Sequence, residues 1–407
     1  MFSLEKVSNR PLWDYIILYS IPFAYFRGFE YIGFDITMLK MFLFVSVFCL
    51  FFYVAKTLFH VTDDVSQYSK NILYVFLISS AMALVFHDQG LVMSYRSGIS
   101  FAFIIFYFYL IRRKFTIREI QYMVAFYGTL WVLLWLIAQY NAPVRLFGDP
   151  DAAINEQRGI SRFLIPGDCF LYMFYFLMLT KWLNNNKKIF FLCVIALFTI
   201  IFLQVTRQTI IVTLIVTIYY LYKKKKYWYL SVLSLFLAFV VYNTDIHDNT
   251  MLAKMLYLSK EQMQDMRTEQ EGTRTYSYIY FMSEMPNEYL TMIFGNGFPH
   301  TESEWGKSFI ELKDYGIYLS DVGYPAVFVI FGILGLVVFA KLLYYILSHS
   351  FSEQVHYAVL FLLYILICNF MSFVINVSMA AICVSLYLLY LSNNESKDKL
   401  VSVDTNK

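Results

Sequence analysis

The chain is dominated by apolar blocks that are long enough to cross a lipid bilayer. Of its 407 residues, 59% are hydrophobic and only 15% are charged, which excludes an ordinary soluble domain. A spanning helix needs roughly 20 apolar residues. We therefore predict an all-α polytopic membrane protein with about twelve transmembrane helices, at residues 12–27, 38–58, 71–87, 92–111, 120–140, 165–182, 188–205, 208–222, 227–243, 322–346, 355–371 and 373–391.

The lysines indicate how these spans are oriented. With the N-terminus placed inside, the short loops on one side contain Lys114, Lys187–Lys188 and Lys223–Lys226. Cytoplasmic loops of membrane proteins carry such an excess of positive charge. We therefore predict that both termini are cytoplasmic.

The loop lengths divide the chain into four parts. Residues 1–242 form a predicted N-terminal membrane bundle of about nine spans, and residues 321–392 form the C-terminal membrane helices. Between spans 9 and 10 lies the loop 243–320. Because aromatic residues recur along it, we expect it to fold as an extracytoplasmic cap of short helices. Residues 393–407 are a predicted cytoplasmic tail.

Arginine is distributed differently from lysine. The predicted outer side keeps eight of the twelve arginines but only five of the twenty lysines. The planar guanidinium binds phosphate or carboxylate through two parallel hydrogen bonds, which lysine cannot do. Arginine retained on the side that disfavours positive charge therefore indicates an anionic ligand. The eight outer arginines are Arg27, Arg96, Arg145, Arg158, Arg162, Arg207, Arg267 and Arg274.

The first candidate motif is the Thr-Arg-Gln turn at Arg207 and Gln208, where two apolar spans meet with almost no loop. A charge at that position is costly and points to function. The alternative is that Arg207 only anchors a helix end, with its charged head reaching the interface.

The second motif lies in the large loop and combines Arg274 and Tyr276 with the segment around Asn296 and His300. The aromatic residues beside Arg274 suit either a sugar-stacking floor or an interfacial belt. The Gly-Asn-Gly run lacks the lysine and the length of a phosphate-binding loop, so a plain turn is an alternative. His300 is a candidate base or a solvated loop residue.

The third motif is Asp321-Val-Gly-Tyr324-Pro at the outer mouth of the predicted tenth span. Asp321 is a candidate catalytic or substrate-orienting residue, and Tyr324 a candidate binding residue. The alternative for Asp321 is a helix N-cap, a position that aspartate favours.

The fourth motif contains Arg158 and Arg162, which share a face if the segment is helical. Like charges at this spacing repel, so we predict an anionic partner, which is either a substrate or Asp168. The five cysteines show no CxxC spacing. We therefore expect neither a metal nor a cofactor, and no nucleic-acid partner.

Taken in order, these motifs resemble those of the O-antigen ligase and polymerase superfamily, the multi-pass glycosyltransferases of bacterial surface-polysaccharide assembly. The resemblance covers about residues 140–345. It rests on Arg162-x-x-x-Pro166, the turn at Arg207, Arg274, the Phe294-Gly-Asn-Gly297 segment, and Asp321-x-Gly-Tyr-Pro325 followed by Gly332-Ile-Leu-Gly335-Leu336.

This resemblance implies a metal-independent transfer from an undecaprenyl-pyrophosphate-linked glycan on the outer face of the bacterial inner membrane. The ligase branch has a His-Asn pair near the start of the span after the large loop, whereas this chain has Ser320-Asp321. The sequence therefore favours the polymerase branch, whose acceptor is another lipid-linked repeat unit. Membrane lipid, a repeat-unit flippase and a chain-length regulator are the partners that this function implies.

Three other functions remain open at this stage. A ligase that transfers glycan to lipid A-core would use the same donor. A flippase for the same lipid also needs outer arginines, but usually shows internal repeats and charges deep in the membrane, and no repeat is visible here. A structural partner in an envelope complex would not need the arginines.

Overall fold

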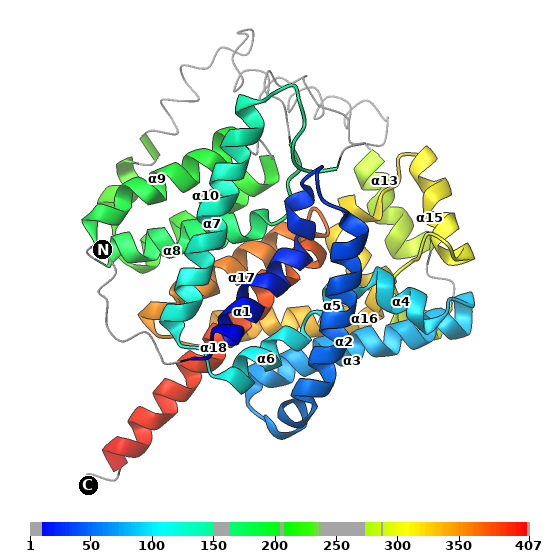
Figure 1. Cartoon of the computed structure of the whole chain (residues 1–407), viewed down its shortest axis with the longest axis horizontal. Helices are drawn as coiled ribbons and strands as arrows, with labels where there is room; N and C mark the ends of the chain where they lie inside the picture. Colours follow the sequence, from blue (N-terminus) through cyan, green and yellow to red (C-terminus); the bar gives the residue numbers. More distant parts are fainter. Residues whose placement is uncertain are drawn as a thin grey trace.

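The computed structural model describes residues 10–149, 163–184, 186–203, 207–232, 234–235, 273–285 and 288–404. These residues form a helical bundle that contains no β-strand (Figure 1). The all-α prediction is therefore confirmed for this part of the chain.

Helices of very different length make up the bundle. The α-helices are α1 (Leu12–Tyr25), α2 (Ile36–His60), α3 (Asp64–His87), α4 (Leu91–Ser97), α5 (Ile99–Ala102), α6 (Ile105–Arg113), α7 (Ile117–Tyr140), α8 (Asp168–Leu183), α9 (Phe190–Phe198), α10 (Arg207–Lys223), α13 (Thr273–Ile279), α14 (Tyr289–Phe294), α15 (Glu304–Asp314), α16 (Gly323–Ser348), α17 (His356–Cys368) and α18 (Val374–Asp404). Short 3-10 helices are η1 (Arg27–Glu30), η3 (Lys187–Ile189), η6 (Leu319–Asp321) and η7 (Glu353–Val355), and π-helical turns are η4 (Thr199–Leu203) and η5 (Tyr280–Glu284).

Five of the described helices are long and apolar enough to cross a membrane, namely α2, α3, α7, α16 and the Val374–Asn394 part of α18. A sixth span results if the pair Leu91–Ser97 and Ile99–Arg113, which bends by 79°, is counted as one. These six correspond to the predicted spans 38–58, 71–87, 92–111, 120–140, 322–346 and 373–391. The described residues thus contain five to six candidate membrane-spanning helices, as expected for a helical membrane protein.

The predicted count of about twelve spans is not confirmed, because other apolar blocks form shorter helices. α1 has 14 residues, α8 has 16, α10 has 17 and α17 has 13. The block 188–205 is divided into η3, the 9-residue α9 and the π-helical turn η4. The predicted span 227–243 lies mostly outside the described residues.

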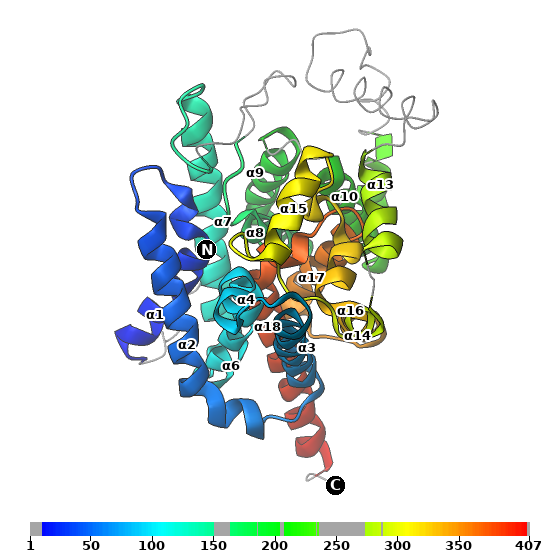
Figure 2. The same cartoon turned by 90° about the vertical axis from the view of Figure 1, so that its right-hand side faces the viewer.

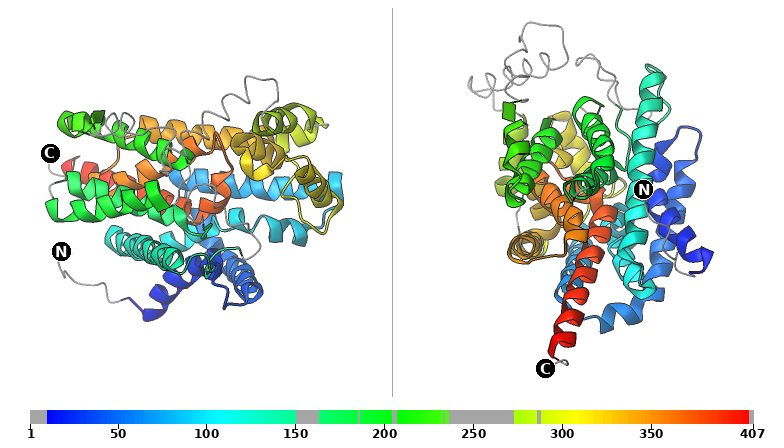
Figure 3. Two further views of the ribbon diagram at one scale, coloured as in Figure 1. Left: turned by 90° about the horizontal axis from the view of Figure 1, so that it is seen from above. Right: turned by 90° about the vertical axis from the view of Figure 1, so that its left-hand side faces the viewer.

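The distribution of buried residues separates peripheral from central helices. In α2 only one stripe is buried, while Phe42, Phe48 and Phe52 on its other face are about half exposed or more, as expected for a helix that faces lipid. In α8 every residue from Cys169 to Thr180 is buried, because it contacts α7, α9 and α17. A helix that is apolar all round belongs in the interior. Figure 3 shows the green and orange helices on one side of the molecule and dark-blue α1 and α2 on the other.

The described part of the large loop, residues 273–285 and 288–320, consists of the short helices α13, η5, α14, α15 and η6. Figure 2 shows α13, α14 and α15 gathered on one side of the bundle next to α16. Residues 243–272 lie outside the described part of the chain.

The segment after α14 packs into a break in α16. Gly332 has φ 65° and ψ −164°, which interrupts the helical backbone. The carbonyl oxygen of Val329 accepts a hydrogen bond from the Asn296 backbone N–H at 2.9 Å, and that of Ile330 accepts one from Gly297 at 3.0 Å. A broken helix is tolerated in a membrane when neighbouring groups satisfy its backbone in this way.

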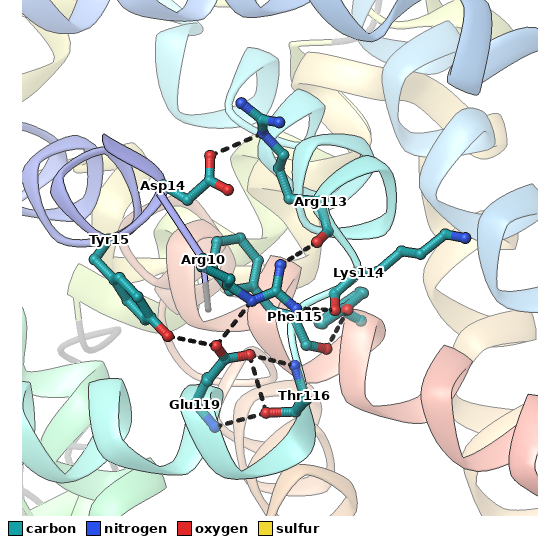
Figure 4. A network of polar contacts seen from close by, with 9 residues as sticks. Arg10, Asp14, Tyr15, Arg113, Lys114, Phe115, Thr116 and Glu119 are labelled. Carbon is teal, nitrogen blue, oxygen red and sulfur yellow. Dashed lines mark hydrogen bonds and ion pairs between the residues drawn. The ribbon is translucent and has the colours of Figure 1, made fainter. Parts of the chain in front are cut away.

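The loops that we predict to be cytoplasmic meet at one end of the bundle. Lys224 forms an ion pair with Glu353, and Gln121 donates to the Gln354 carbonyl at 3.3 Å. Glu119 accepts from Arg10 Nε at 2.8 Å and from the Tyr15 hydroxyl at 2.6 Å (Figure 4). α18 continues beyond its predicted end at residue 391 to Asp404 and projects from the bundle (Figure 1).

Candidate functional site

The candidate site is centred on the turn between α17 and α18, residues 369–373. Asn369 in this turn is fully buried, and its Oδ1 accepts from the Ile375 backbone N–H at 3.3 Å. Its Nδ2 has no hydrogen-bond partner among the described residues. A buried amide without a partner is costly, so Asn369 is a candidate polar contact for a ligand.

The start of α10 packs against this turn. The Gln208 side chain donates from Nε2 to the Cys368 carbonyl at 2.5 Å, and its Oε1 accepts from the Ser372 hydroxyl at 3.1 Å. Arg207 precedes Gln208 as the first residue of α10 and is partly exposed. Residues 204–206, which complete the predicted polar turn, lie outside the described part of the chain.

The approach to α16 meets the same turn from another side. The Ser320 carbonyl accepts from the Phe373 backbone N–H at 3.0 Å. Gly323 lies directly against the Asn369 carbonyl. Asp321, in η6, is partly exposed, and one of its carboxylate oxygens accepts from the Ser320 hydroxyl at 3.3 Å.

The structure contradicts the interpretation of Asp321 as an N-cap. The N-cap residue of α16 is Val322, and no side chain caps this helix end. A carboxylate that pairs with a cation or caps a helix has a structural role. Within the described residues, Asp321 forms neither an ion pair nor a capping hydrogen bond.

Helix α13 brings Arg274 toward the same place. Burial raises the pKa of the Tyr278 hydroxyl above its usual value, whereas the Gly323 backbone N–H and the Arg274 guanidinium beside it lower that pKa. Both groups therefore lie near the Tyr278 hydroxyl. Arg274 and Tyr276 are exposed, and the Tyr276 ring lies 6.3 Å from that of Tyr280.

Helix α8 contributes Asp168, its first residue, to the far side of the cluster. The Asp168 carboxylate interacts electrostatically with Tyr364 and Cys368 of α17. The Tyr172 ring, one turn along α8, lies 4.6 Å from the Tyr364 ring. Asp168 thus belongs to the polar surroundings of the turn 369–373.

Tyr324 borders the site as part of its framework. Its hydroxyl donates to the Leu366 carbonyl at 2.9 Å, and its ring packs on Phe370 at 4.8 Å. This contact joins the start of α16 to the end of α17, so the Tyr324 hydroxyl is already engaged within the protein.

The structure places Asn296 and His300 in a separate polar network. Asn296 Oδ1 accepts from His87 Nε2 at 2.8 Å, and Asn296 Nδ2 donates to the Val329 carbonyl at 3.1 Å. The His300 backbone N–H donates to Gln89 Oε1 at 2.9 Å. Both residues are buried, so their described contacts join the loop 295–303 to α3 and α4.

Of the predicted site residues, Gln208 and Tyr324 contact the turn 369–373 or its flanking residues. Asp321 follows Ser320, which is bonded to that turn, and Arg207 and Arg274 lie on the neighbouring helices α10 and α13. Arg158 and Arg162 lie outside the described residues. Sequence reasoning missed Asn369, Ser372 and Tyr278. The available signal was the pair Asn369 and Ser372, which interrupts two adjoining apolar blocks.

The described fold and the cluster of arginine, carboxylate and amide groups define a helical membrane protein with a polar site at one end of its helices. Comparison with known protein families, curated proteins and solved structures gave no match.

Proposed function

We propose that the chain is a polymerase that joins undecaprenyl-pyrophosphate-linked oligosaccharide repeat units into O-antigen, capsular polysaccharide or exopolysaccharide. We place its site on the outer face of the bacterial inner membrane, with both termini in the cytoplasm. One observation supports the proposal best. The segments that contain Arg207, Arg274 and Asp321 all lie close to the turn 369–373.

The chemistry of the transfer explains why arginines are needed. The acceptor hydroxyl oxygen forms a bond to C1 of the donor sugar, the bond from C1 to the pyrophosphate oxygen breaks, and undecaprenyl pyrophosphate leaves with the electron pair. Negative charge therefore grows on the leaving phosphate. Hydrogen-bond donors fixed in advance around that charge lower the barrier. In this proposal Arg207 and Arg274 bind the pyrophosphate, with Arg158 or Arg162 assisting.

The remaining residues have roles that follow from their positions. Asp321 accepts the proton of the acceptor hydroxyl or orients the acceptor sugar, because its carboxylate is partly exposed beside the turn 369–373. Gln208 holds the start of α10 against that turn through two hydrogen bonds. Tyr276, exposed two residues after Arg274 in α13, offers an aromatic face for a sugar ring.

Deletion of the gene tests the proposal through the surface glycan of the cell. A polymerase deletion leaves a single repeat unit attached to its final carrier. Long chains that accumulate on the lipid carrier would instead identify a ligase, and repeat units trapped on the cytoplasmic side would identify a flippase. Complementation with wild-type protein must restore the original chain length.

Cysteine labelling tests the orientation of the site. Lys307 in α15 and Lys225 after α10 are both exposed, so each is replaced by cysteine in a chain whose exposed Cys49 is changed to alanine. A membrane-impermeant maleimide should label position 307 but not 225 in cells with a permeabilised outer envelope. Labelling of 225 alone would invert the topology and remove the site from the outer face.

A further inference from the structure

A pocket lies at the opposite end of the bundle from the turn 369–373. Its volume is about 620 Å³, within the range of small-molecule sites. The walls come from the start of α7, the end of α8, the following connection with η3, and η7. The lysine asymmetry places all of these segments in the cytoplasm.

The pocket contains two cations from different helices. Arg118 is in the first turn of α7, and Lys181 is near the end of α8. Both are partly buried, and the positive charge of Arg118 disfavours the charged form of Lys181. Two like charges held close together in a partly desolvated recess disfavour each other.

An anion would remove this repulsion, and the described lining contains little negative charge of its own. Glu353 is the one acid among the lining residues, and its carboxylate is paired with Lys224, which does not line the pocket. Gln121, Asn184 and Asn186 add neutral side-chain amides to the lining. Guanidinium, ammonium and amide N–H groups are together the donors that bind phosphate.

We propose that this pocket binds a phosphate-bearing anion through Arg118 and Lys181. Two sources share this chemistry, namely the headgroup of an anionic phospholipid of the cytoplasmic leaflet and a small soluble phosphate. The proposal is independent of the polymerase function, because none of the pocket residues belongs to the outer cluster.

The test uses full-length protein purified in a neutral detergent at fixed ionic strength. Its thermal unfolding midpoint is followed by tryptophan fluorescence during titration with short-chain phosphatidylglycerol, short-chain phosphatidylcholine or inorganic phosphate. We expect saturable stabilisation by phosphatidylglycerol, by inorganic phosphate or by both, and none by phosphatidylcholine. Stabilisation by phosphate alone assigns a soluble ligand, and stabilisation by phosphatidylglycerol alone assigns a lipid headgroup.

Matched variants separate the pocket from the general positive charge of this face. Arg118→Gln and Lys181→Gln should each weaken binding at least about tenfold, because each removes one charge-assisted contact. Lys188→Gln removes an exposed cation of the same connection that does not line the pocket, and it should bind like the wild type. Equal weakening by all three variants would show nonspecific attraction and overturn the proposal.

A third pocket variant guards against loss of folding in the first two. Gln121→Glu adds a carboxylate to the lining without removing a cation, so it should also weaken binding about tenfold or more. Wild-type affinity in this variant, or stabilisation by phosphatidylcholine equal to that by phosphatidylglycerol, would likewise contradict the proposal.

Discussion

Gly323 and Asn369 pack backbone against backbone at the centre of the candidate site. A Cβ atom at position 323 would lie 1.5 Å from the Asn369 carbonyl oxygen and 3.0 Å from that of Ser372. The start of α16 can therefore approach the turn 369–373 only because residue 323 has no side chain. This approach also sets the distance between Asp321 and the residues that follow α17.

Gly323→Ala should therefore separate α16 from the turn. Overpacking of a fixed backbone contact costs about 1–3 kcal/mol, so we expect a lower unfolding midpoint in detergent and a loss of polymer. Gly90→Ala is the control, because no atom lies within 4 Å of its added Cβ. Wild-type stability and chain length in Gly323→Ala would contradict this account of the contact.

Arg207→Lys and Arg274→Lys test whether the fork of the guanidinium matters. Lysine keeps the charge and the ability to reach the interface but loses the paired hydrogen bonds. We expect at least about tenfold less polymer from each variant, equivalent to one charge-assisted contact. The measurement is glycan length at matched protein level.

Arg96→Lys is the control for both variants, since Arg96 is an exposed arginine in α4, outside the candidate site. Its polymer should be of wild-type length. Polymer of wild-type length from Arg207→Lys and Arg274→Lys would contradict the proposal and would indicate that these two arginines only anchor their helices.

Asp321→Asn removes a candidate proton acceptor and keeps the shape of the side chain. Because Asp321 is not the N-cap of α16, we expect little change in the unfolding midpoint but about a hundredfold loss of polymerisation rate. Asp314→Asn, at an exposed position at the end of α15, should have no effect. A near-normal rate in Asp321→Asn would leave the proton acceptor unassigned.

The Glu119 network joins the start of the described chain to α7 (Figure 4). Its carboxylate accepts from Arg10, Tyr15 and Thr116, and it completes a capping box with Thr116. Glu119→Ala leaves the partly buried donors of Arg10 and Tyr15 unsatisfied, so we expect a loss of about 2–4 kcal/mol, measured as a lower unfolding midpoint. Glu304→Ala, which breaks the exposed pair with Lys307, should cost less than about 1 kcal/mol.

Anion binding in the pocket at Arg118 should depend on pH. Burial, together with the Arg118 guanidinium, lowers the pKa of Lys181 to about 8; this residue lies in the last turn of α8, outside the candidate spans. The ligand needs the charged ammonium, so affinity should be full below pH 7 and fall as the pH rises through 8. Glu353, the other ionisable lining group, has a pKa lowered by Lys224 and stays charged in this interval.

The control is Lys181→Arg. The arginine at position 181 stays charged at pH 9, so the affinity of this variant should not fall between pH 7 and pH 9. An affinity for inorganic phosphate or phosphatidylglycerol that is the same at pH 7 and pH 9 in the wild type would exclude Lys181 as the titrating contact.

Local sequence was sufficient for the helical fold of the described residues and for five or six of the membrane segments. Apolar blocks such as 38–58 and 322–346 are long and uninterrupted, so their length alone predicts a spanning helix. It was not sufficient for blocks such as 165–182 and 188–205, because the ends of α8 and α9 depend on how the chain turns against its neighbours.

The candidate site could be predicted only in part for the same reason. Arg207, Arg274 and Asp321 were recognised because a charged residue beside an apolar block stands out in the sequence. Asn369 was not recognised, since its importance comes from burial and from the approach of Gly323, 46 positions earlier in the chain. Likewise, the role of Asn296 depends on the break at Gly332, because Asn296 bonds to the Val329 carbonyl beside that break.

The sequence by itself determined which segments are apolar enough to span a membrane and where along the chain the lysines collect, because hydropathy and charge act locally. Only the tertiary structure decided that α10, α13, α16 and α17 meet around residues 369–373, and that Arg118 and Lys181 share one pocket. Contacts between segments far apart in the chain depend on backbone packing and on the geometry of each turn, which no local pattern encodes.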